Sequence, residues 1–363
     1  MTVRRRIAAL TAGAIGVAVA GTAAEVARRR RVISRRGAGD RTPFGSLHSP
    51  PVTVVADDGV PLHVEVDEFD HHPPRGRRRN GRADEPGLTV VFCHGYALNL
   101  DCWHFQRAGY RGLVRAVYYD QRSHGRSGRS TEKKKATVDQ LGHDLRRILD
   151  EVVPDGPVVL VGHSMGGMAI IALAEQHPEL FGSRVVGVGL ISTTAGGLDP
   201  HRIVLPLLPR TVGGQLATRL VATLARGHRQ VDGLRRVGKS VASVMTDLFA
   251  FGDDVPESYV DFVDGMLSAT PFEVVAEFFP VFGELDKFDA VAALESVPTT
   301  IICGTGDKLT SVGHSRKLHS KLPHSVLVEC EGAGHMVIME RHDRVNAALD
   351  QLIAAAAERV DSR

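Results

Sequence analysis

The stretch that decides the fold is VVLVGHSMGGMAI, residues 158–170. An apolar run stops at Gly162, Ser164 follows, and Gly166 comes two residues later. A strand that passes directly into a helix in this way holds the serine on a sharp, strained turn, with its hydroxyl clear of the backbone. Larger side chains at 162 and 166 would collide with neighbouring elements, so glycine is needed at both. The stretch therefore predicts a reactive hydroxyl at the end of a buried strand.

The helix expected to begin directly after Ser164 makes this position suited to chemistry. Its first backbone N–H groups are unpaired and its dipole is positive there, so both attract developing negative charge. A second interpretation is a glycine-rich turn in which the Ser164 side chain only caps the helix. The pentapeptide alone leaves both interpretations open, and the rest of the chain has to decide between them.

Composition describes an ordinary globular protein. The chain has 363 residues, of which 43% are hydrophobic and 24% charged, enough for one large domain with an insertion or for two domains. The formal net charge is only +2, so we expect no nucleic-acid partner. The four cysteines form no CxxC pair, and three of them lie in apolar runs, so we expect neither a metal site nor a disulfide framework.

Short apolar runs rich in β-branched residues alternate with stretches of helical spacing through most of the chain. The first two runs flank Asp57-Asp58-Gly59, as the strands of a hairpin would. The later runs are nearly continuous in apolar residues, which is typical of strands covered on both faces. This pattern predicts the α/β class, with a mostly parallel eight-stranded sheet and helices on both of its faces. The predicted strands cover 52–56, 62–66, 88–93, 114–119, 158–162, 185–191, 299–303 and 325–330, and the predicted core helices cover 138–153, 165–177, 311–322 and 344–357.

The alternation is interrupted between Asp199 and Ala290, where strands vanish and amphipathic helices take over. In an open α/β sheet, ligands bind beyond the carboxyl ends of the strands, and an insertion arising there covers that site. We therefore predict a helical cap, or lid, at 199–290, inserted into a core formed by 51–198 and 291–363. Most cap phenylalanines must belong to its own core, while a few line a pocket that spacing alone does not identify. The predicted cap helices cover 212–227, 237–251, 257–269 and 272–282.

The amino terminus has a composition of its own: residues 1–35 form a basic and apolar leader, and 36–50 read as a linker. Residues 7–24 are uncharged, follow three arginines at 4–6, and reach the lower limit for a membrane span. A signal peptide, a membrane-anchoring helix and a soluble leader helix all fit this stretch. Four further arginines at 28–31 resist export, so we favour an anchor that holds the following domain at the cytoplasmic side of a membrane surface. Export to the cell envelope is the alternative location.

Two later strand ends supply the partners that a reactive serine needs. A serine hydroxyl is a weak nucleophile without a base, and a histidine base needs a carboxylate to fix its tautomer. The strand TTIIC runs into a loop that carries Asp307, and the strand SVLVEC runs into a loop that carries His335. Asp286 and Asp289 precede the first of these strands and are weaker candidates. We therefore expect Ser164, Asp307 and His335 to meet as a catalytic triad.

A further strand end predicts a site for negative charge. The strand LTVVFC ends in His94-Gly95-Tyr96, and Gly95 allows the backbone to turn back toward the serine. The backbone N–H groups of Tyr96 and Met165 then converge on a carbonyl oxygen as an oxyanion hole. We expect His94 to brace this loop by a hydrogen bond, in support of the site together with the glycines at 95, 162 and 166. Residues 120–127 read as a rigid, hydrogen-bonded turn behind it.

At these positions the chain resembles the α/β-hydrolase superfamily, and most closely its capped branch of serine esterases, lipases and peroxidase-like enzymes. The resemblance covers residues 50–358. It implies Ser164 as the nucleophile, His335 as general base and then acid, and Asp307 as the group that orients it. Serine instead of aspartate at 164 disfavours epoxide hydrolase and haloalkane dehalogenase activity. The motifs that carry the resemblance are FCHGYALNLDCW, DQRSHGRS, in which Ser123 replaces a glycine that relatives often have, GHSMGG, GTGDKLT and GAGHMVIMERHD.

The expected activity is hydrolysis of carboxylic esters through an acyl-enzyme on Ser164, with no metal or organic cofactor. An apolar cap and the leader favour an acylglycerol or another medium-to-long acyl ester as the small-molecule or lipid substrate. The same triad also serves an acyltransferase, a cofactor-free haloperoxidase or perhydrolase, and an amidase or peptidase. A non-catalytic, ligand-binding hydrolase fold is the alternative of a different class. The sequence leaves the oligomeric state open.

Overall fold

The computed structural model describes residues 25–36, 43–69, 87–129, 136–199, 243 and 246–362. Within these residues the fold is built on one sheet of eight strands, in the order β1-β2-β4-β3-β5-β6-β7-β8. The β1–β2 and β2–β4 pairs are antiparallel and all other pairs are parallel. Each strand ends within one residue of its predicted bounds, so the predicted sheet is confirmed. The strands are β1 (Pro51–Val55), β2 (Pro61–Asp67), β3 (Thr89–Cys93), β4 (Arg115–Tyr119), β5 (Val158–His163), β6 (Val185–Ile191), β7 (Thr299–Gly304) and β8 (Val326–Cys330).

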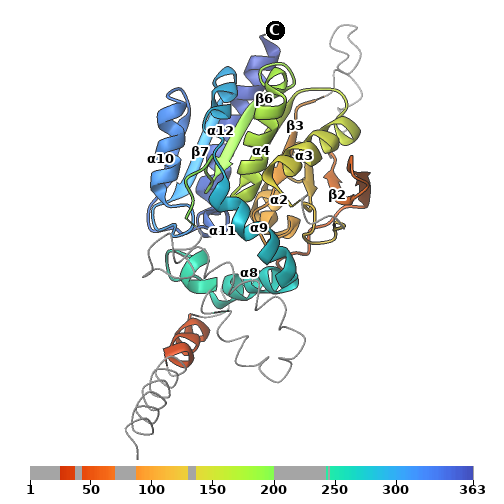
Figure 1. The fold of residues 1–363 in the computed structure, drawn as a ribbon. Helices are drawn as coiled ribbons and strands as arrows, with labels where there is room; N and C mark the ends of the chain where they lie inside the picture. Colours follow the sequence, from red (N-terminus) through yellow and green to blue (C-terminus); the bar gives the residue numbers. More distant parts are fainter. Residues whose placement is uncertain are drawn as a thin grey trace, which may run out of the picture.

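Helices cover both faces of this sheet (Figure 1). One face packs against α3, α4 and α10, and the other packs against α2, α11 and α12. Every residue of β3, β5, β6 and β7 is buried, which explains why their sequences are apolar without alternation. The core helices are α2 (His104–Tyr110), α3 (Val138–Val152), α4 (Met165–Gln176), α10 (Val312–Lys321), α11 (Val337–Glu340) and α12 (His342–Asp361), with short 3-10 helices at η1 (Leu100–Trp103), η3 (Pro178–Leu180) and η6 (Ala290–Ser296).

The helix α4 is the element that positions the site, because it begins directly after Ser164. Its first ten residues, MGGMAIIALA, are all buried, so it lies in the interior and not at the surface. It packs against β3, β5 and α3. The neighbouring α3 is amphipathic and begins at Thr137, whose side chain accepts a hydrogen bond from the Gln140 N–H. Burial on all sides holds the amino terminus of α4 at the end of β5.

The cap occupies one end of the sheet, between β6 and β7 in the chain (Figure 1). Its described helical residues include 246–250. The helix α8 (Glu257–Ala269) matches the prediction, and α9 (Phe272–Glu284) extends two residues beyond it. The two ends of the insertion lie side by side, because Gly196 and Asp286 form an antiparallel bridge and the Lys287 N–H donates to the Ala195 carbonyl. The predicted helix 212–227 and most of 237–251 lie outside the described residues. The boundaries 199–290 stay a prediction.

The described part of the amino-terminal region packs against the cap. Residues 25–35 are helical, and Ile33 is fully buried in the main core cluster. Further along, in the segment read as linker, the Phe44 ring stacks on Phe262 of α8 at 5.1 Å and meets the His104 ring edge-on at 5.2 Å. The rings that this segment contacts lie far away in the sequence, so its composition alone suggested a linker.

The predicted membrane-anchoring stretch, residues 7–24, lies outside the described residues. Among the helices that the structure does describe, none combines the length and the apolar character needed to cross a membrane.

Candidate active site

The Ser164 turn has the strained geometry that the sequence predicts. Ser164 adopts φ 53° and ψ −117°, a conformation that side-chain-bearing residues rarely take. A Cβ atom on Gly162 would lie 2.5 Å from the Gly167 nitrogen, and one on Gly166 would lie 2.0 Å from the Cys93 carbonyl oxygen. Both glycines are therefore required by close backbone contacts. The Ser164 side chain makes no capping hydrogen bond to α4, so the interpretation as a helix cap is wrong.

The structure brings the three predicted side chains together from three strand ends. His335 Nε2 lies 2.9 Å from Ser164 Oγ, and His335 Nδ1 lies 2.9 Å from Asp307 Oδ2. The relative exposures of Ser164, Asp307 and His335 are 8%, 4% and 7%. With Nδ1 protonated and donating to Asp307, the Nε2 lone pair faces the serine hydroxyl. This arrangement is able to take a proton from Ser164 and to stabilise the resulting imidazolium.

The Asp307 carboxylate is held ionised by its hydrogen bonds. Burial alone would raise its pKa, but His335, the Leu309 N–H and the Thr310 hydroxyl together lower it below the ordinary value. Sequence reasoning missed Thr310, whose Oγ1 lies 2.9 Å from Asp307 Oδ2 and 2.8 Å from the Ser192 carbonyl oxygen. The signal was a threonine three residues after an aspartate, a spacing at which side chains and backbone often form a local turn.

His163, next to the serine, braces the histidine loop. Its Nε2–H donates to the His335 carbonyl at 2.9 Å, and the two rings lie 4.9 Å apart. Burial lowers the pKa of His163 to about 3, so the ring stays neutral beside its partner. The His163 side chain thus fixes the backbone that carries the base.

The loop after β3 approaches the serine closely. A Cβ atom on Gly95 would lie 2.8 Å from the His163 ring and 3.2 Å from the Ser164 Cβ, so only glycine fits there. Tyr96 follows Gly95 directly, and Met165 follows the serine. Among the hydrogen bonds of the described residues, none uses the backbone N–H of Tyr96 or of Met165. Two segments with available amides thus flank the reactive hydroxyl, and their role as an oxyanion hole stays a prediction.

His94 acts as the predicted brace. It is fully buried, its Nδ1–H donates to the Gly95 carbonyl at 2.7 Å, and its Nε2 accepts from the Gln121 N–H at 2.9 Å. The Gln121 side-chain amide donates in turn to the His94 carbonyl. Burial lowers the pKa of His94 to about 4, which keeps the ring neutral and suited to this double role. The loop after β3 is thereby tied to the turn after β4.

The turn at residues 120–127 is rigid, as the sequence indicates. Asp120 accepts hydrogen bonds from the Leu100 N–H at 2.8 Å and the Arg126 N–H at 2.7 Å. Arg122 is fully buried and pairs with Asp144 in α3. Ser123 has φ 67°, a left-handed conformation that favours glycine, so the departure from the usual motif carries local strain.

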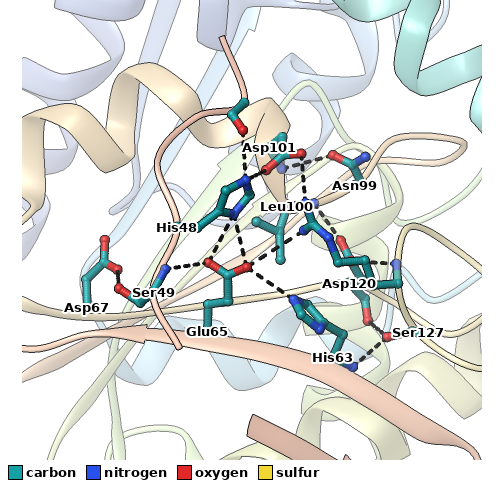
Figure 2. Close-up of polar contacts among 12 residues, drawn as sticks. His48, Ser49, His63, Glu65, Asp67, Asn99, Leu100, Asp101, Asp120 and Ser127 are labelled. Atoms are coloured by element: carbon teal, nitrogen blue, oxygen red, sulfur yellow. Dashed lines mark hydrogen bonds and ion pairs between the residues drawn. The ribbon is translucent and has the colours of Figure 1, made fainter. Parts of the chain in front are cut away.

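A polar network continues from this turn to the amino-terminal segment (Figure 2). Its centre is Glu65 of β2, which accepts from the Ser49 N–H at 2.9 Å, faces the His48 and His63 rings at 3.1 Å, and pairs with buried Arg107 at 2.8 Å. Burial alone would raise the pKa of Glu65, but hydrogen bonds from Ser49, His63 and Arg107 lower it to about 2. The network fixes β2 against the residues that follow the loop after β3.

A cavity of about 920 Å³ opens from Ser164 and His335 toward the cap. The cap is tethered to the loop that lines it, because the Tyr96 hydroxyl donates to the Val275 carbonyl and the Thr270 hydroxyl donates to the Ala97 carbonyl at 3.0 Å. Most of the lining is apolar, and the cap phenylalanines that reach it are now identified. The apolar side chains that line the cavity include Met168, Leu198, Phe249, Val263, Leu267, Phe279, Phe282, Leu309 and Met336.

The cysteines are not part of the predicted triad. All four cysteines, Cys93, Cys102, Cys303 and Cys330, are buried and free. In the part of the chain that the structure describes, no group of three or more His, Cys, Asp or Glu side chains is arranged to hold a metal ion.

Comparison with known proteins places the chain in a family. A family model described as "Alpha/beta hydrolase family" matches residues 90–348. The chain belongs to this family. The predicted superfamily, the predicted hydrolase sheet and the prediction of a hydrolase enzyme are confirmed.

Relatives of this alpha/beta hydrolase include enzymes with named substrates. The chain is 28% identical to 3-oxoadipate enol-lactonase 2 of Acinetobacter baylyi over 75% of its own length and 90% of the relative. It is 25% identical to a monoacylglycerol lipase of Mycolicibacterium smegmatis over 68% of its own length and 84% of the relative. The structure of a thermophilic esterase from Thermogutta terrifontis superposes with a TM-score of 0.65, at 22% identity, over 85% of this chain and 99% of the esterase.

Proposed function

We propose that the chain hydrolyses carboxylic esters through an acyl-enzyme on Ser164. Ser164 Oγ attacks the ester carbonyl carbon while His335 Nε2 takes its proton. The carbonyl oxygen becomes an oxyanion and accepts hydrogen bonds from the Tyr96 and Met165 N–H groups. Asp307, ionised and bonded to Nδ1–H, stabilises the imidazolium. The ester C–O bond then breaks, and the alkoxide leaves as an alcohol with the proton from Nε2.

The second half of the reaction reverses these roles. Water attacks the acyl carbon and passes a proton to His335 Nε2, which returns it to Ser164 Oγ as the carboxylic acid leaves. The observation that carries the proposal is the pair of 2.9 Å contacts that join Ser164, His335 and Asp307. The strained serine turn supports it, because backbone strain at a single polar residue is typical of catalytic sites.

The cavity supports an apolar ester as the substrate. Its volume of about 920 Å³ lies at the upper end of the range for small-molecule pockets, and most of its described lining is apolar. Burial of apolar surface contributes about 0.8 kcal/mol per CH₂ group, so a medium-length acyl chain gains substantial affinity there. We propose an acylglycerol or another ester with a medium-to-long acyl chain. The likeness to a monoacylglycerol lipase favours the same class.

We further propose that the protein works at a membrane surface, with the hydrolase on the cytoplasmic side. The uncharged residues 7–24 and the arginines at 28–31 support this location, since positive charge resists export. The measurement is fractionation of cells followed by carbonate extraction of membranes. Full-length protein should remain in the stripped membrane fraction, and recovery of all protein in the soluble fraction would overturn the location without touching the reaction.

A series of p-nitrophenyl esters of increasing acyl length tests the reaction. The purified chain should release p-nitrophenol, with kcat/KM rising from acetate to the medium chains. Ser164→Ala should lower kcat by at least about 10⁴-fold, since removal of one triad member leaves little more than binding and oxyanion stabilisation. Ester hydrolysis that survives in folded Ser164→Ala at the wild-type rate would refute the proposal.

A further inference from the structure

The loop that carries His335 lies against a short segment of the cap, residues 250–253. The Met336 N–H, directly after the predicted base, donates to the Ala250 carbonyl at 2.8 Å. A Cβ atom on Gly334, directly before the base, would lie 2.4 Å from a backbone nitrogen of this segment. The two backbones are therefore in close contact on both sides of the histidine.

One carboxylate bonds to both partners of this contact. Glu340 is the last residue of α11, which spans only four residues and so returns the chain to the loop that it follows. Its Oε1 accepts from the Gly334 N–H at 2.6 Å, and its Oε2 accepts from the Gly252 and Asp253 N–H groups at 3.1 and 3.2 Å. A carboxylate has two oxygens that only accept, so it suits a site where three backbone donors converge.

The residues around the base are each held from outside the loop. Hydrogen bonds to Glu340, His163 and Ala250 hold residues 334–336, in that order. Burial raises the pKa of Glu340, and the three N–H donors act in the opposite direction by stabilising the carboxylate. Hydrogen bonds to an ionised acceptor are roughly twice as strong as those between neutral groups. Glu340 should therefore contribute more to the position of the loop than either of the other two partners.

We propose that Glu340 is a positioning residue: by bonding the histidine loop to the cap segment 250–253, it fixes the His335 ring for catalysis. The proposal rests on the proposed esterase function and makes the position of its base depend on the cap. The ring has two contacts to keep, at 2.9 Å each, with Ser164 and Asp307. A displacement of about 1 Å in such a site can lower the rate by about 100-fold.

Glu340→Gln tests the inference in the hydrolysis of a p-nitrophenyl ester. An amide side chain has one acceptor oxygen, and its NH₂ group would face a backbone N–H in either orientation, so one side of the contact is lost. We expect kcat to fall by about 10- to 100-fold, with KM changed by less than about 2-fold, because the ring is displaced while the cavity is kept. Glu331→Gln is the matched control, since Glu331 is exposed and precedes the base in the same loop, and it should keep the wild-type kcat.

A second variant separates positioning from stability alone. Glu340→Asp keeps the charge and both oxygens on a shorter side chain, so its kcat should lie between those of the wild-type protein and Glu340→Gln. It also carries the test if Glu340→Gln does not fold. A role in stability alone would lower the melting temperature and leave the kcat of the folded variants unchanged, and that result would overturn the inference.

Proton NMR on Ser164→Ala needs no turnover and separates failure of this inference from failure of the proposed function. The His335 Nδ1–H that donates to Asp307 should give a low-field signal, assigned by its absence from His335→Ala. The signal should persist when Glu331→Gln is added to Ser164→Ala and weaken when Glu340→Gln is added. That result supports the inference even if the wild-type protein hydrolyses no ester. Equal signals in all three proteins, or no signal in any of them, would refute it independently of catalysis.

Discussion

The strand ends of the core face the same cavity as the cap helices α8 and α9. The core and the cap hold their side chains in place by different means. In the core, hydrogen bonds fix each group of the site: His335 contacts both of its partners at 2.9 Å, and Thr310 and two backbone amides hold Asp307. The cap presents mainly apolar walls to the cavity. Two hydrogen bonds among the described residues join the cap to the loop after β3: the Tyr96 hydroxyl donates to the Val275 carbonyl, and the Thr270 hydroxyl donates to the Ala97 carbonyl.

This difference assigns chemistry and selectivity to separate regions. Hydrogen bonds have preferred lengths and angles, so a buried polar network specifies positions sharply. Apolar contacts lack such directionality. Apolar side chains of the cap can therefore be replaced by others of similar volume at a small cost in stability. Changes in the core should therefore alter kcat and stability, whereas changes in the cap should alter which ester is preferred.

The largest effect is expected at Asp307. Asp307→Asn removes the charge that stabilises protonated His335 and favours the wrong tautomer, so kcat should fall by about 10⁴-fold. Kinetics with a p-nitrophenyl ester measure it, with the fold checked by circular dichroism. Asp289→Asn is the control, because Asp289 is exposed and lies before β7. Similar losses in both variants would show that the core does not hold a triad.

Arg107 tests how strongly the core depends on its buried charges. Arg107 is 2% exposed and pairs with Glu65 at 2.8 Å and Asp67 at 2.6 Å. Arg107→Met leaves two carboxylates buried without their cation and should lower the free energy of unfolding by about 3–5 kcal/mol. Urea denaturation measures it. The pair of Arg316 and Glu329 is screened by solvent and should contribute little to the free energy of unfolding, so a similar loss in Arg316→Met would contradict this ranking.

Acid should weaken the same network. The pKa of Glu65 is about 2 in the folded protein and near its ordinary value of 4.5 in the unfolded chain. The stabilisation is therefore complete above pH 4.5 and is lost as pH falls toward about 2, because the unfolded state binds the proton first. Melting temperatures across this range should fall less steeply in Glu65→Gln than in the wild-type protein. Parallel curves would rule out Glu65 as a source of the acid sensitivity.

A smaller effect is expected where the cap meets the core. Tyr96→Phe removes the hydroxyl that donates to Val275, a bond worth about 0.5–1.5 kcal/mol, and should lower kcat/KM by about 3- to 10-fold. Steady-state kinetics give the value. Tyr110→Phe loses an equivalent bond, to the Asn346 carbonyl at 3.1 Å, and should leave kcat/KM unchanged. Equal effects of the two variants would mean that the tether to the cap has no special role.

The smallest effect is expected at Ser123, where the φ of 67° costs a serine roughly 1–2 kcal/mol. Ser123→Gly relieves that strain but adds freedom to the unfolded chain, at a cost of about 0.5–1 kcal/mol. The net gain in the free energy of unfolding should be up to about 1 kcal/mol, seen as a rise in the denaturation midpoint. A destabilised variant would show that the serine side chain stabilises the turn by its own contacts.

The sequence predicted the core better than the cap for a physical reason. Strands buried on both faces are mainly apolar, so β5 and β7 stood out, and each leads into a segment that carries a candidate catalytic side chain. The edge strand β8 is only partly buried and carries Glu329, but its run of β-branched and apolar residues was still recognisable. Thr310 was missed because its contact with Asp307 depends on the fold of the loop after β7. The cap phenylalanines that line the cavity were not identified, because helical spacing identifies a face of a cap helix but not whether that face meets a core or a cavity. Phe44 was missed because its ring partners, at 104 and 262, are distant in the sequence.

Covalent labelling with a fluorophosphonate, followed by peptide mass spectrometry, shows whether Ser164 is an activated nucleophile. The reagent phosphonylates a serine only when a base activates the hydroxyl and amides hold the developing oxyanion. We expect one adduct, on the peptide that contains Ser164, which is absent in Ser164→Ala and forms much more slowly in His335→Ala. An adduct on another residue, or a folded wild-type protein that takes up no reagent, would contradict this expectation.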